Sequence, residues 1–332
     1  MKSAVKTGNQ NAASPEPRTM SSLKTQHIVA SKTGISHAAD LLKSGALVAF
    51  ATETVYGLGA DARNGQAVAQ VYAAKGRPSF NPLIVHVPDV ATAKKYVKWS
   101  DQAQQIADAF WPGALTLVLP LRADHGLSSL VTAGLSTLAI RVPNHPTAIA
   151  LLRAADAPIA APSANPSGQI SPTTAAHVMA GLDGKIAAVL DDGACRVGLE
   201  STILTLCPTP TLLRAGGVPA EKIEAVLGHS LSAPTDDTIT APGQLASHYA
   251  PRARVRLNIT NPDESDLFLG FGDMKCDLNL SQVGDLTEAA ANLFDHLHQL
   301  DARNKPIAVA PIPMIGLGVA INDRLSRAAA PR

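Results

Sequence analysis

The sequence predicts a mixed α/β protein built from two unequal domains. Short apolar runs that suit buried strands alternate with amphipathic helical segments along most of the chain. The 332 residues allow two domains at the usual ~150 residues each, and each domain is long enough to bury a core. Residues 229–251 are rich in Ser, Thr, Pro and Gly, a composition typical of a linker between such domains.

The elements of the first domain follow from periodicity and stop signals. Residues 64–75 carry apolar side chains at helical spacing, and Gly76 is placed to end that helix. The apolar run 46–51 predicts a buried strand that leads into a turn at Gly57 and Gly59. Further strands are predicted at 83–87, 115–120, 137–142, 159–161, 187–190, 201–206 and 211–214, and further helices at 36–44, 101–110, 146–155, 173–180 and 220–227.

The same reasoning places a small α/β domain at the C-terminal end. Its strands are expected at 254–257, 267–271 and 307–310, and its helices at 287–300 and 317–327. We therefore divide the chain into a disordered tail (1–26), a first domain (27–228), a linker (229–251) and a second domain (252–332). The tail is basic, but Pro15 and Pro17 would break an amphipathic targeting helix, so we favour plain disorder over a targeting signal.

Charge and cysteine content exclude several classes of function. With 28 Lys and Arg against 27 Asp and Glu, the chain has no overall field to collect nucleic acid or an acidic membrane. Apolar runs fall short of the ~18 residues that a membrane span needs, so we expect no membrane association. The three cysteines are far apart and lack the spacing of a disulfide framework or a zinc site, which fits a reducing cytoplasm.

Four cations stand out by position. Lys75 and Arg77 flank Gly76 at a predicted helix end, Arg141 lies inside an apolar strand, and Arg214 ends another. A guanidinium in an apolar strand is costly unless it meets an anion. The anion can be a bound ligand or, for Arg141, an internal carboxylate such as Glu53 or Glu200, and both readings stay open at this point.

Hydroxyl groups and one imidazole complete the candidate site. Thr52, Thr54, Ser163, Ser201 and Thr202 follow or begin predicted strands, where they can bind a polar ligand or simply cap turns. His86 lies on a strand and is either a core histidine or a ligand contact. The chain has no G-x-x-x-x-G-K-[ST] loop, no G-x-G-x-x-G after a strand and no G-x-S-x-G elbow, so a common nucleotide cradle and a serine hydrolase are both excluded.

Six segments in order resemble the YrdC-like domain and, over the chain from about residue 33 onward, the two-domain L-threonylcarbamoyladenylate synthases. They are A-T-E-T-V-Y-G-L-G-A-D at 51–61, K-G-R-P-S-F-N-P-L-I-V-H-V at 75–87, F-W-P-G-A-L-T at 110–116, A-P-S-A-N at 161–165, G-L-E-S-T at 198–202 and S-H-Y-A-P at 247–251. The second domain also resembles the family's accessory domain, although it is shorter than expected. Ala51 departs from the proline usual in the family, which loosens the turn that follows.

The resemblance implies a YrdC-like twisted mixed sheet with a small Rossmann-like second domain, and an ATP-dependent nucleotidyltransferase. Such enzymes join L-threonine, bicarbonate or CO2, and ATP into threonylcarbamoyl-AMP and pyrophosphate for N6-threonylcarbamoyladenosine in tRNA. Carried over by motif, the implied threonine contacts are Thr54, His86, Arg141, Ala161 and Ser201; the implied ATP contacts are Arg77, Asn81, Thr137, Ser163, Ser171, Arg214 and Tyr249; and Lys75 and Arg77 are the implied catalytic cations.

The resemblance also sets expectations for cofactor and partners. Mg2+ should arrive with ATP, held by phosphate oxygens and water, so no metal-binding residues are expected in the chain. The product is expected to pass to the tRNA threonylcarbamoyl-transferase complex, and tRNA contact is conceivable. An RNA-binding module of the same fold without synthase activity is the alternative. A third reading, the carbamoyl-transfer chemistry of hydrogenase-maturation proteins, lacks the zinc-finger cysteine pairs that accompany the domain there.

Overall fold

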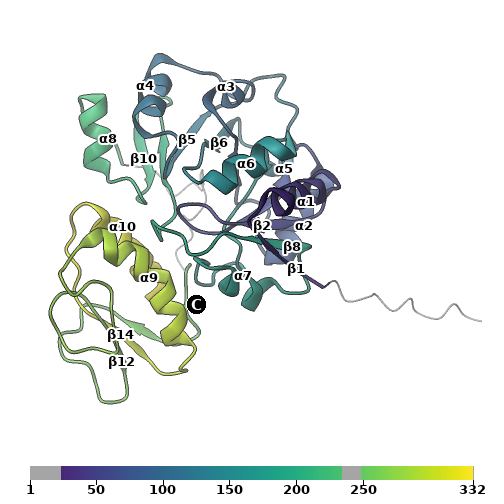
Figure 1. The fold of residues 1–332 in the computed structure, drawn as a ribbon. Helices are drawn as coiled ribbons and strands as arrows, with labels where there is room; N and C mark the ends of the chain where they lie inside the picture. Colours follow the sequence, from purple (N-terminus) through teal and green to yellow (C-terminus); the bar gives the residue numbers. More distant parts are fainter. Residues whose placement is uncertain (1–23, 234–247, 332) are drawn as a thin grey trace, which may run out of the picture.

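The computed structural model describes residues 24–233 and 248–331, arranged as a larger and a smaller α/β body (Figure 1). The elements are β1 (Gln26–Val29), α1 (Lys32–Lys43), β2 (Val48–Phe50), β3 (Gly57–Asp61), α2 (Gly65–Lys75), β4 (Ile84–His86), α3 (Val90–Ala93), α4 (Asp101–Phe110), β5 (Leu115–Pro120), α5 (Ser129–Thr132), β6 (Thr137–Arg141), α6 (Pro146–Ala155), β7 (Ile159–Ala160), α7 (Ala175–Leu182), β8 (Ala188–Asp191), β9 (Thr202–Thr205), β10 (Thr211–Arg214), α8 (Ala220–Leu227), β11 (Val255–Arg256), β12 (Leu267–Gly270), β13 (Leu278–Asn279), α9 (Leu286–Asp301), β14 (Ile307–Val309) and α10 (Leu317–Ala329).

The larger body is built on one mixed sheet of ten described strands, in the order β1-β8-β2-β3-β7-β4-β6-β5-β9-β10. The sheet contains both parallel pairs, such as β4 with β6, and antiparallel pairs, such as β5 with β6. The predicted mixed α/β sheet flanked by helices is therefore confirmed.

Side chains on the two faces of this sheet enter different cores. Residues alternate in direction along a strand, so Val48 and Phe50 pack with α1 and α6, whereas Ala49 between them faces the main core with α2 and α4. On the half of the sheet that contains β4, β6, β5 and β9, the α1 side carries only a small apolar cluster, which includes Ile84 and Ala139. Ile84 also lines the polar cavity described below, so the cavity lies over this half.

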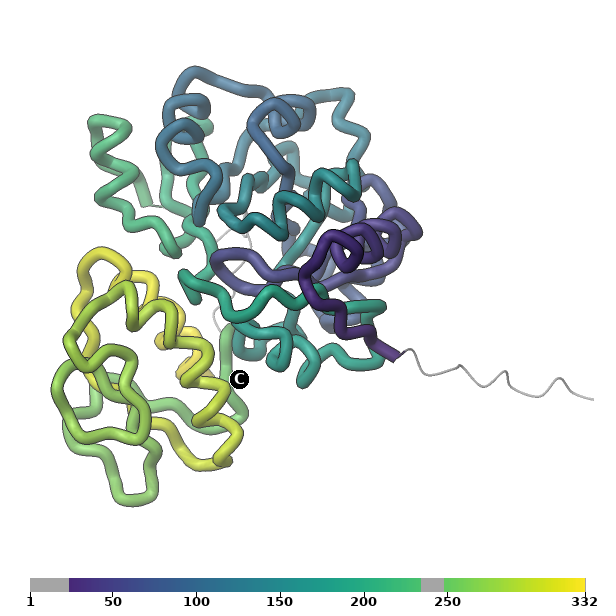
Figure 2. Tube along the Cα trace, viewed as in Figure 1, coloured from purple at the N-terminus to yellow at the C-terminus, as the bar shows by residue number. Residues whose placement is uncertain are grey.

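The smaller body contains a parallel sheet of four described strands, in the order β11-β14-β12-β13. Helices α9 and α10 lie on the side of this sheet that faces the larger body (Figure 1). Their apolar side chains share one core with Val55, Ile170, Leu199 and Tyr249 from outside the small sheet. The chain trace shows the same C-terminal lobe, green to yellow, against the rest of the molecule (Figure 2).

Most predicted elements lie where the pattern put them, and the differences have local causes. Helices α4, α6 and α8 and strands β5 and β10 have the predicted bounds. Helix α1 begins four residues earlier than predicted because Ser31 caps it, accepting a hydrogen bond from the Gly34 N–H. Helix α7 begins two residues later because Thr174 caps it.

The predicted glycine turn at Gly57 and Gly59 is wrong, since both residues lie in β3, which pairs antiparallel with β2. A Cβ on Gly59 would lie 3.0 Å from both Phe50 and Ile159, so glycine here permits close packing rather than a turn. The short elements β1, α3, α5 and β13 were not predicted at all.

The predicted tail falls mostly outside the described residues, as does the central part of the predicted linker, 234–247. The domain limits that depend on these segments stay predictions. Among the described helices, none combines the length and the apolar character needed to cross a lipid bilayer.

Candidate functional site

A polar cavity opens over the larger sheet, at the side where the smaller body adjoins it. About 530 Å³ of space lies between its walls when the open solvent at its mouth is included. Its walls come from segments far apart in sequence: the β2–β3 connection, β4, the end of β6, the segment after β7, the segment before β9, and the end of β10. The lining residues are Thr52, Thr54, Val55, Gly57, Arg77, Ile84, His86, Arg141, Ala161, Pro162, Ser163, Glu200, Ser201, Arg214, His248 and Tyr249.

The β2–β3 connection is shaped by the hydroxyl of Thr52. This oxygen donates to the Val55 carbonyl at 2.6 Å and accepts from the N–H groups of Thr54 and Val55. It also lies 2.8 Å from the Thr54 hydroxyl. Such a side-chain turn fixes the backbone locally, so it compensates for the Ala51 position and holds Thr54 in the cavity wall.

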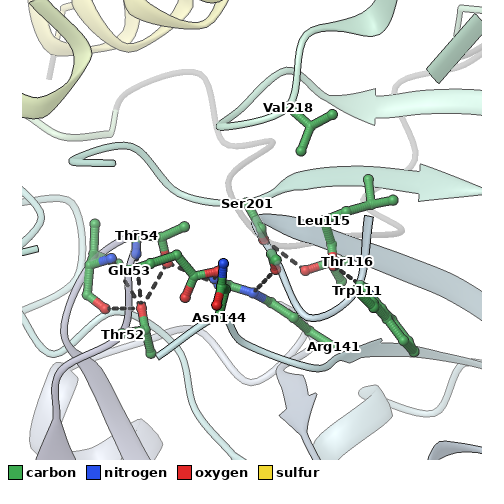
Figure 3. Close-up of polar contacts among 12 residues, drawn as sticks. Thr52, Glu53, Thr54, Trp111, Leu115, Thr116, Arg141, Asn144, Ser201 and Val218 are labelled. Carbon is green, nitrogen blue, oxygen red and sulfur yellow. Dashed lines mark hydrogen bonds and ion pairs between the residues drawn. The ribbon is translucent and has the colours of Figure 1, made fainter. Parts of the chain in front are cut away.

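Arg141 is held on three sides at the end of β6 (Figure 3). Its Nη1 donates to the Thr54 hydroxyl at 2.9 Å and its Nε to the Gly113 carbonyl at 3.0 Å. Its Nη2 lies 2.6 Å from Glu53 Oε1, a buried ion pair that lacks the alignment of a hydrogen bond. The internal-carboxylate reading is therefore confirmed with Glu53 as the partner, and Arg141 lines the cavity as well.

His86 lies one strand away on β4, paired in register with Arg141 on β6. Burial, followed by the charge of Arg141, lowers the pKa of His86 to about 3. The ring is therefore neutral near pH 7. Its Nδ1 has no hydrogen-bond partner among the described residues, although the side chain is buried and lines the cavity. A neutral imidazole with an unpaired nitrogen suits a substrate hydroxyl better than it suits a carboxylate.

Ser201 and Arg214 form another part of the cavity wall. The Ser201 hydroxyl lies 2.7 Å from the hydroxyl of Thr116, a polar residue inside strand β5. Arg214 reaches back to the same residue, donating from Nη2 to the Ser201 carbonyl at 2.8 Å and to its hydroxyl at 3.3 Å. The end of β10 thus places the Arg214 guanidinium at Ser201, the residue that precedes β9. Ser201 also lies near Arg141 (Figure 3).

Lys75 and Arg77 do different things, although they flank one glycine. Gly76 ends α2 with φ of +60°, a conformation that glycine adopts without strain. Lys75 does not line the cavity, and its amine donates to the carbonyls of Ser163, which does, and of Asn165. Arg77 lines the cavity and donates to the carbonyls of Asn81 and Pro82, at 3.3 and 3.0 Å.

Burial lowers the pKa of both cations. It lowers the pKa of Lys75 well below its ordinary value, with the charge of Arg77 as a further cause. It also lowers the pKa of Arg77 to about 10. Arg77 is therefore charged near pH 7 and available to an anion in the cavity.

The remaining predicted contacts lie at or just behind the walls. Ala161 and Ser163 line the cavity, and the Ala161 N–H is bonded to the Ile84 carbonyl. Asn81 is fully buried, and neither its amide nitrogen nor its oxygen has a hydrogen-bond partner among the described residues. Ser171 is buried behind the wall and donates to Glu200. Thr137 begins β6 on the same face as Arg141 but does not line the cavity.

The sequence did not reveal two of the groups that shape this cavity. Thr116 is a hydroxyl in an otherwise apolar strand, and that mismatch is the signal that could have found it. Glu200 was considered only as a partner for Arg141, whereas it binds Ser171 and Arg324. Among the described residues, no three His, Cys, Asp or Glu side chains cluster as a metal site would require.

Comparisons with known proteins agree along the chain. A family model for the Sua5, YciO and YrdC proteins, described as "Telomere recombination", matches residues 40–216. A model described as "Threonylcarbamoyl-AMP synthase, C-terminal domain" matches residues 218–330. The chain is 42% identical to a threonylcarbamoyl-AMP synthase of Bacillus subtilis, covering 90% of this chain and 93% of that protein.

A relative from an archaeon is also similar over most of the chain. A threonylcarbamoyl-AMP synthase of Pyrococcus abyssi is 39% identical over 88% of this chain and 92% of its own length. A crystal structure of P. abyssi Sua5 complexed with L-threonine superposes with a TM-score of 0.84 at 37% identity, covering 92% of this chain and 97% of that one.

Proposed function

The chain belongs to the family of two-domain threonylcarbamoyl-AMP synthases, and from this premise we propose that it joins L-threonine, bicarbonate or CO2, and ATP into L-threonylcarbamoyl-AMP. Pyrophosphate is the second product. The adenylate supplies the threonylcarbamoyl group of N6-threonylcarbamoyladenosine in tRNA.

The observation that carries the proposal is the charge inventory of the cavity. Arg77, Arg141 and Arg214 line it, and of its described lining residues Glu200 alone carries a carboxylate. That carboxylate is already paired with Arg324 at 2.8 Å, and Glu53 behind the lining offsets the charge of Arg141. Arg77 and Arg214 still leave the cavity cationic, although the whole chain has a formal net charge of only +1. Such a local concentration of guanidinium groups suits a triphosphate and a carbamate bound side by side.

The reaction needs charge cancellation and alignment more than it needs a protein nucleophile. The threonine amine adds to CO2 and loses a proton to give a carbamate. A carbamate oxygen then attacks the α-phosphorus of ATP. The bond between this phosphorus and the oxygen that bridges it to the β-phosphorus breaks, and pyrophosphate leaves. Nucleophile and electrophile are both anionic, so fixed cations that hold them in line lower the barrier.

We assign the two substrates to the two sides of the cavity. Thr54, His86, Arg141, Ala161 and Ser201 would bind threonine, with the neutral His86 facing its hydroxyl. The ATP side would comprise Arg77, Asn81, Thr137, Ser163, Ser171, Arg214 and Tyr249. The unpaired amide of buried Asn81 supports this assignment, because a buried polar group without a partner is costly unless a ligand satisfies it.

We propose an indirect role for Lys75, unlike the cavity arginines. Its amine binds the carbonyls of Ser163 and Asn165, so it would hold the loop that carries Ser163 rather than touch the phosphates first. Mg2+ would enter as the magnesium complex of ATP, held by phosphate oxygens and water.

The RNA-binding alternative is not favoured. The cations that distinguish this chain are buried in the cavity, where they cannot grip a duplex backbone. Transfer of the product to the tRNA-modifying machinery and action in the cytoplasm stay predictions. The latter is supported by the three cysteines, all of which are free thiols.

The direct test follows pyrophosphate release from magnesium-ATP. Release is expected to require both threonine and bicarbonate and to fall sharply when valine replaces threonine. Release that continues at the same rate without threonine or bicarbonate would overturn the proposal. Salt-sensitive binding of tRNA without ATP, in the absence of any such release, would support the alternative instead.

A further inference from the structure

Helix α10 of the smaller body inserts an arginine that no motif assigned to the site. Arg324 is fully buried and is among the largest of the fully buried side chains in the described part of the chain. Arginine is rarely buried to this extent unless its charge is matched. Its partners therefore show what the helix contributes.

Three of those partners come from outside the small sheet. Nε of Arg324 donates to Glu200 Oε2 at 2.8 Å, and Nη2 donates to the Ala215 carbonyl at 2.9 Å. The guanidinium also lies over the ring of Tyr249, 5.0 Å from its centroid. The neighbouring Asp323 accepts from Nη1. One side chain thus joins α10 to the segment before β9, the segment after β10, and the chain that enters the smaller body.

Glu200 connects Arg324 to Ser171, which we assigned to the ATP side of the cavity. Its Oε2 accepts from Arg324, and its Oε1 accepts from the Ser171 hydroxyl at 2.5 Å. Burial alone would raise the pKa of Glu200, yet the charges of Arg324 and Arg214 and the Ser171 hydrogen bond lower it overall. The carboxylate stays ionised, and without Arg324 it would stand as a poorly compensated anion in a cavity meant for phosphate.

Tyr249 depends on the same guanidinium. Its backbone has φ of +62°, a conformation uncommon for a large side chain that persists only where surrounding contacts hold it. The ring lies between Arg324 and Phe294 of α9, whose centroid is 5.6 Å away. The adjoining backbone is tied on both sides, from His248 N–H to the Arg327 carbonyl and from Ala250 N–H to the Gly168 carbonyl.

We propose that Arg324 is a positioning residue for ATP, through which the smaller body completes the nucleotide side of the cavity. It orients Glu200 with Ser171, fixes the ring of Tyr249, and cancels the charge of Glu200. The inference rests on the function proposed above for the choice of ATP as ligand. The threonine side is built by other contacts, because Arg141 is held by Glu53, Thr54 and Gly113.

The test replaces Arg324 and measures the two substrates separately. Arg324→Met keeps the length of the side chain and removes its charge. We expect it to weaken binding of a non-hydrolysable ATP analogue by about tenfold or more, the effect of losing one good charge-assisted contact. Threonine binding, measured alone by calorimetry, should change less than twofold. Arg303→Met is the control, since Arg303 lies in the smaller body and pairs with Asp277, and neither residue lines the cavity.

Two further variants separate positioning from folding. Arg324→Lys keeps the charge without the forked geometry, and we expect an intermediate affinity for the analogue. Glu200→Gln combined with Arg324→Met removes the uncompensated carboxylate and should recover part of the lost affinity.

The outcomes distinguish this inference from the proposed function. Unchanged analogue binding in Arg324→Met, or equal losses for the analogue and for threonine in both Arg324 variants, would overturn the positioning role. If instead the unmodified protein binds the analogue but releases no pyrophosphate that depends on threonine and bicarbonate, the proposed function fails and the binding data still decide the role of Arg324.

Discussion

Replacing Lys75 by Met tests whether this lysine holds the cavity loop before any ligand binds. The amine is buried and donates to two carbonyls, those of Ser163 and Asn165. Met has a similar length and shape but no donor, so the Asn165 carbonyl loses its partner, while the Ser163 carbonyl keeps the Asn165 N–H. The orphaned buried acceptor costs about 1–3 kcal/mol and the lost second hydrogen bond about 1 kcal/mol, roughly 2–4 kcal/mol together. Relief from burying the amine offsets part of this, leaving a net loss of roughly 2 kcal/mol.

The loss is measurable by urea unfolding of the ligand-free protein. With a slope of about 3 kcal/mol per M, a loss of roughly 2 kcal/mol lowers the midpoint by about 0.7 M. Lys95→Met is a matched control, because Lys95 is exposed and the substitution is the same. The loop that carries Ser163 should also loosen, so the apparent KM for ATP should rise more than the KM for threonine.

The result that would refute this reasoning is a Lys75→Met midpoint equal to that of Lys95→Met. Lys75 would then contribute nothing to the ligand-free fold. A fall in turnover without any loss of stability would point to direct contact with the phosphates or the carbonate instead.

Three other predictions concern the two substrates and acid stability. Arg77→Ala should raise the KM for ATP, and Arg141→Ala should chiefly raise the KM for threonine. Equal changes in both constants would refute the assignment of the two arginines to different substrates. His86→Leu should reduce the preference for threonine over valine, measured as a ratio of kcat/KM, from as much as ~10⁴ toward the ~10² of an apolar pocket. An unchanged ratio would show that the hydroxyl of the substrate threonine binds another partner. Burial, with the charge of the stacked His177, lowers the pKa of His298 to about 4, so the unfolded chain binds this proton first and stability is lost as pH falls from about 6.5 to 4. His298→Gln does not titrate and should lose less of its urea midpoint between pH 7 and pH 5 than the unmodified protein; an equal loss would show that this imidazole does not contribute.

Local sequence was sufficient wherever a short segment decides its own conformation. The end of α2 was predicted because Gly76 adopts a left-handed conformation that stops a helix. Helices α4 and α6 were predicted residue for residue, since apolar spacing and a capping residue or proline lie within the segment itself. The motifs also identified most of the residues that line the cavity, because their order along the chain is specific to one family.

Elements that depend on distant partners were missed. Strand β1 has only four residues and pairs with β8 more than 150 residues away. Strand β3 contains two glycines, and its pairing with β2 and β7 cannot be read from its composition. Short strands of this kind gain their stability from the neighbours they pair with, so their own residues carry little signal.

The amino-acid sequence determined which chemical groups the molecule has and which segments carry them. Of the three cavity arginines, Arg77 follows a predicted helix and the other two lie in predicted strands, while several hydroxyls and the imidazole of His86 lie in or beside strands. Only the tertiary structure decided how the charges pair, giving Glu53 to Arg141, Glu200 to Arg324, and the Lys75 amine to two carbonyls. The physical reason is that the strength of an ion pair depends on distance and burial in space, and neither is fixed by separation along the chain. Arg324 illustrates this, since on its own helix it is an ordinary polar residue, and burial against the larger body pairs it with Glu200 in the cavity wall.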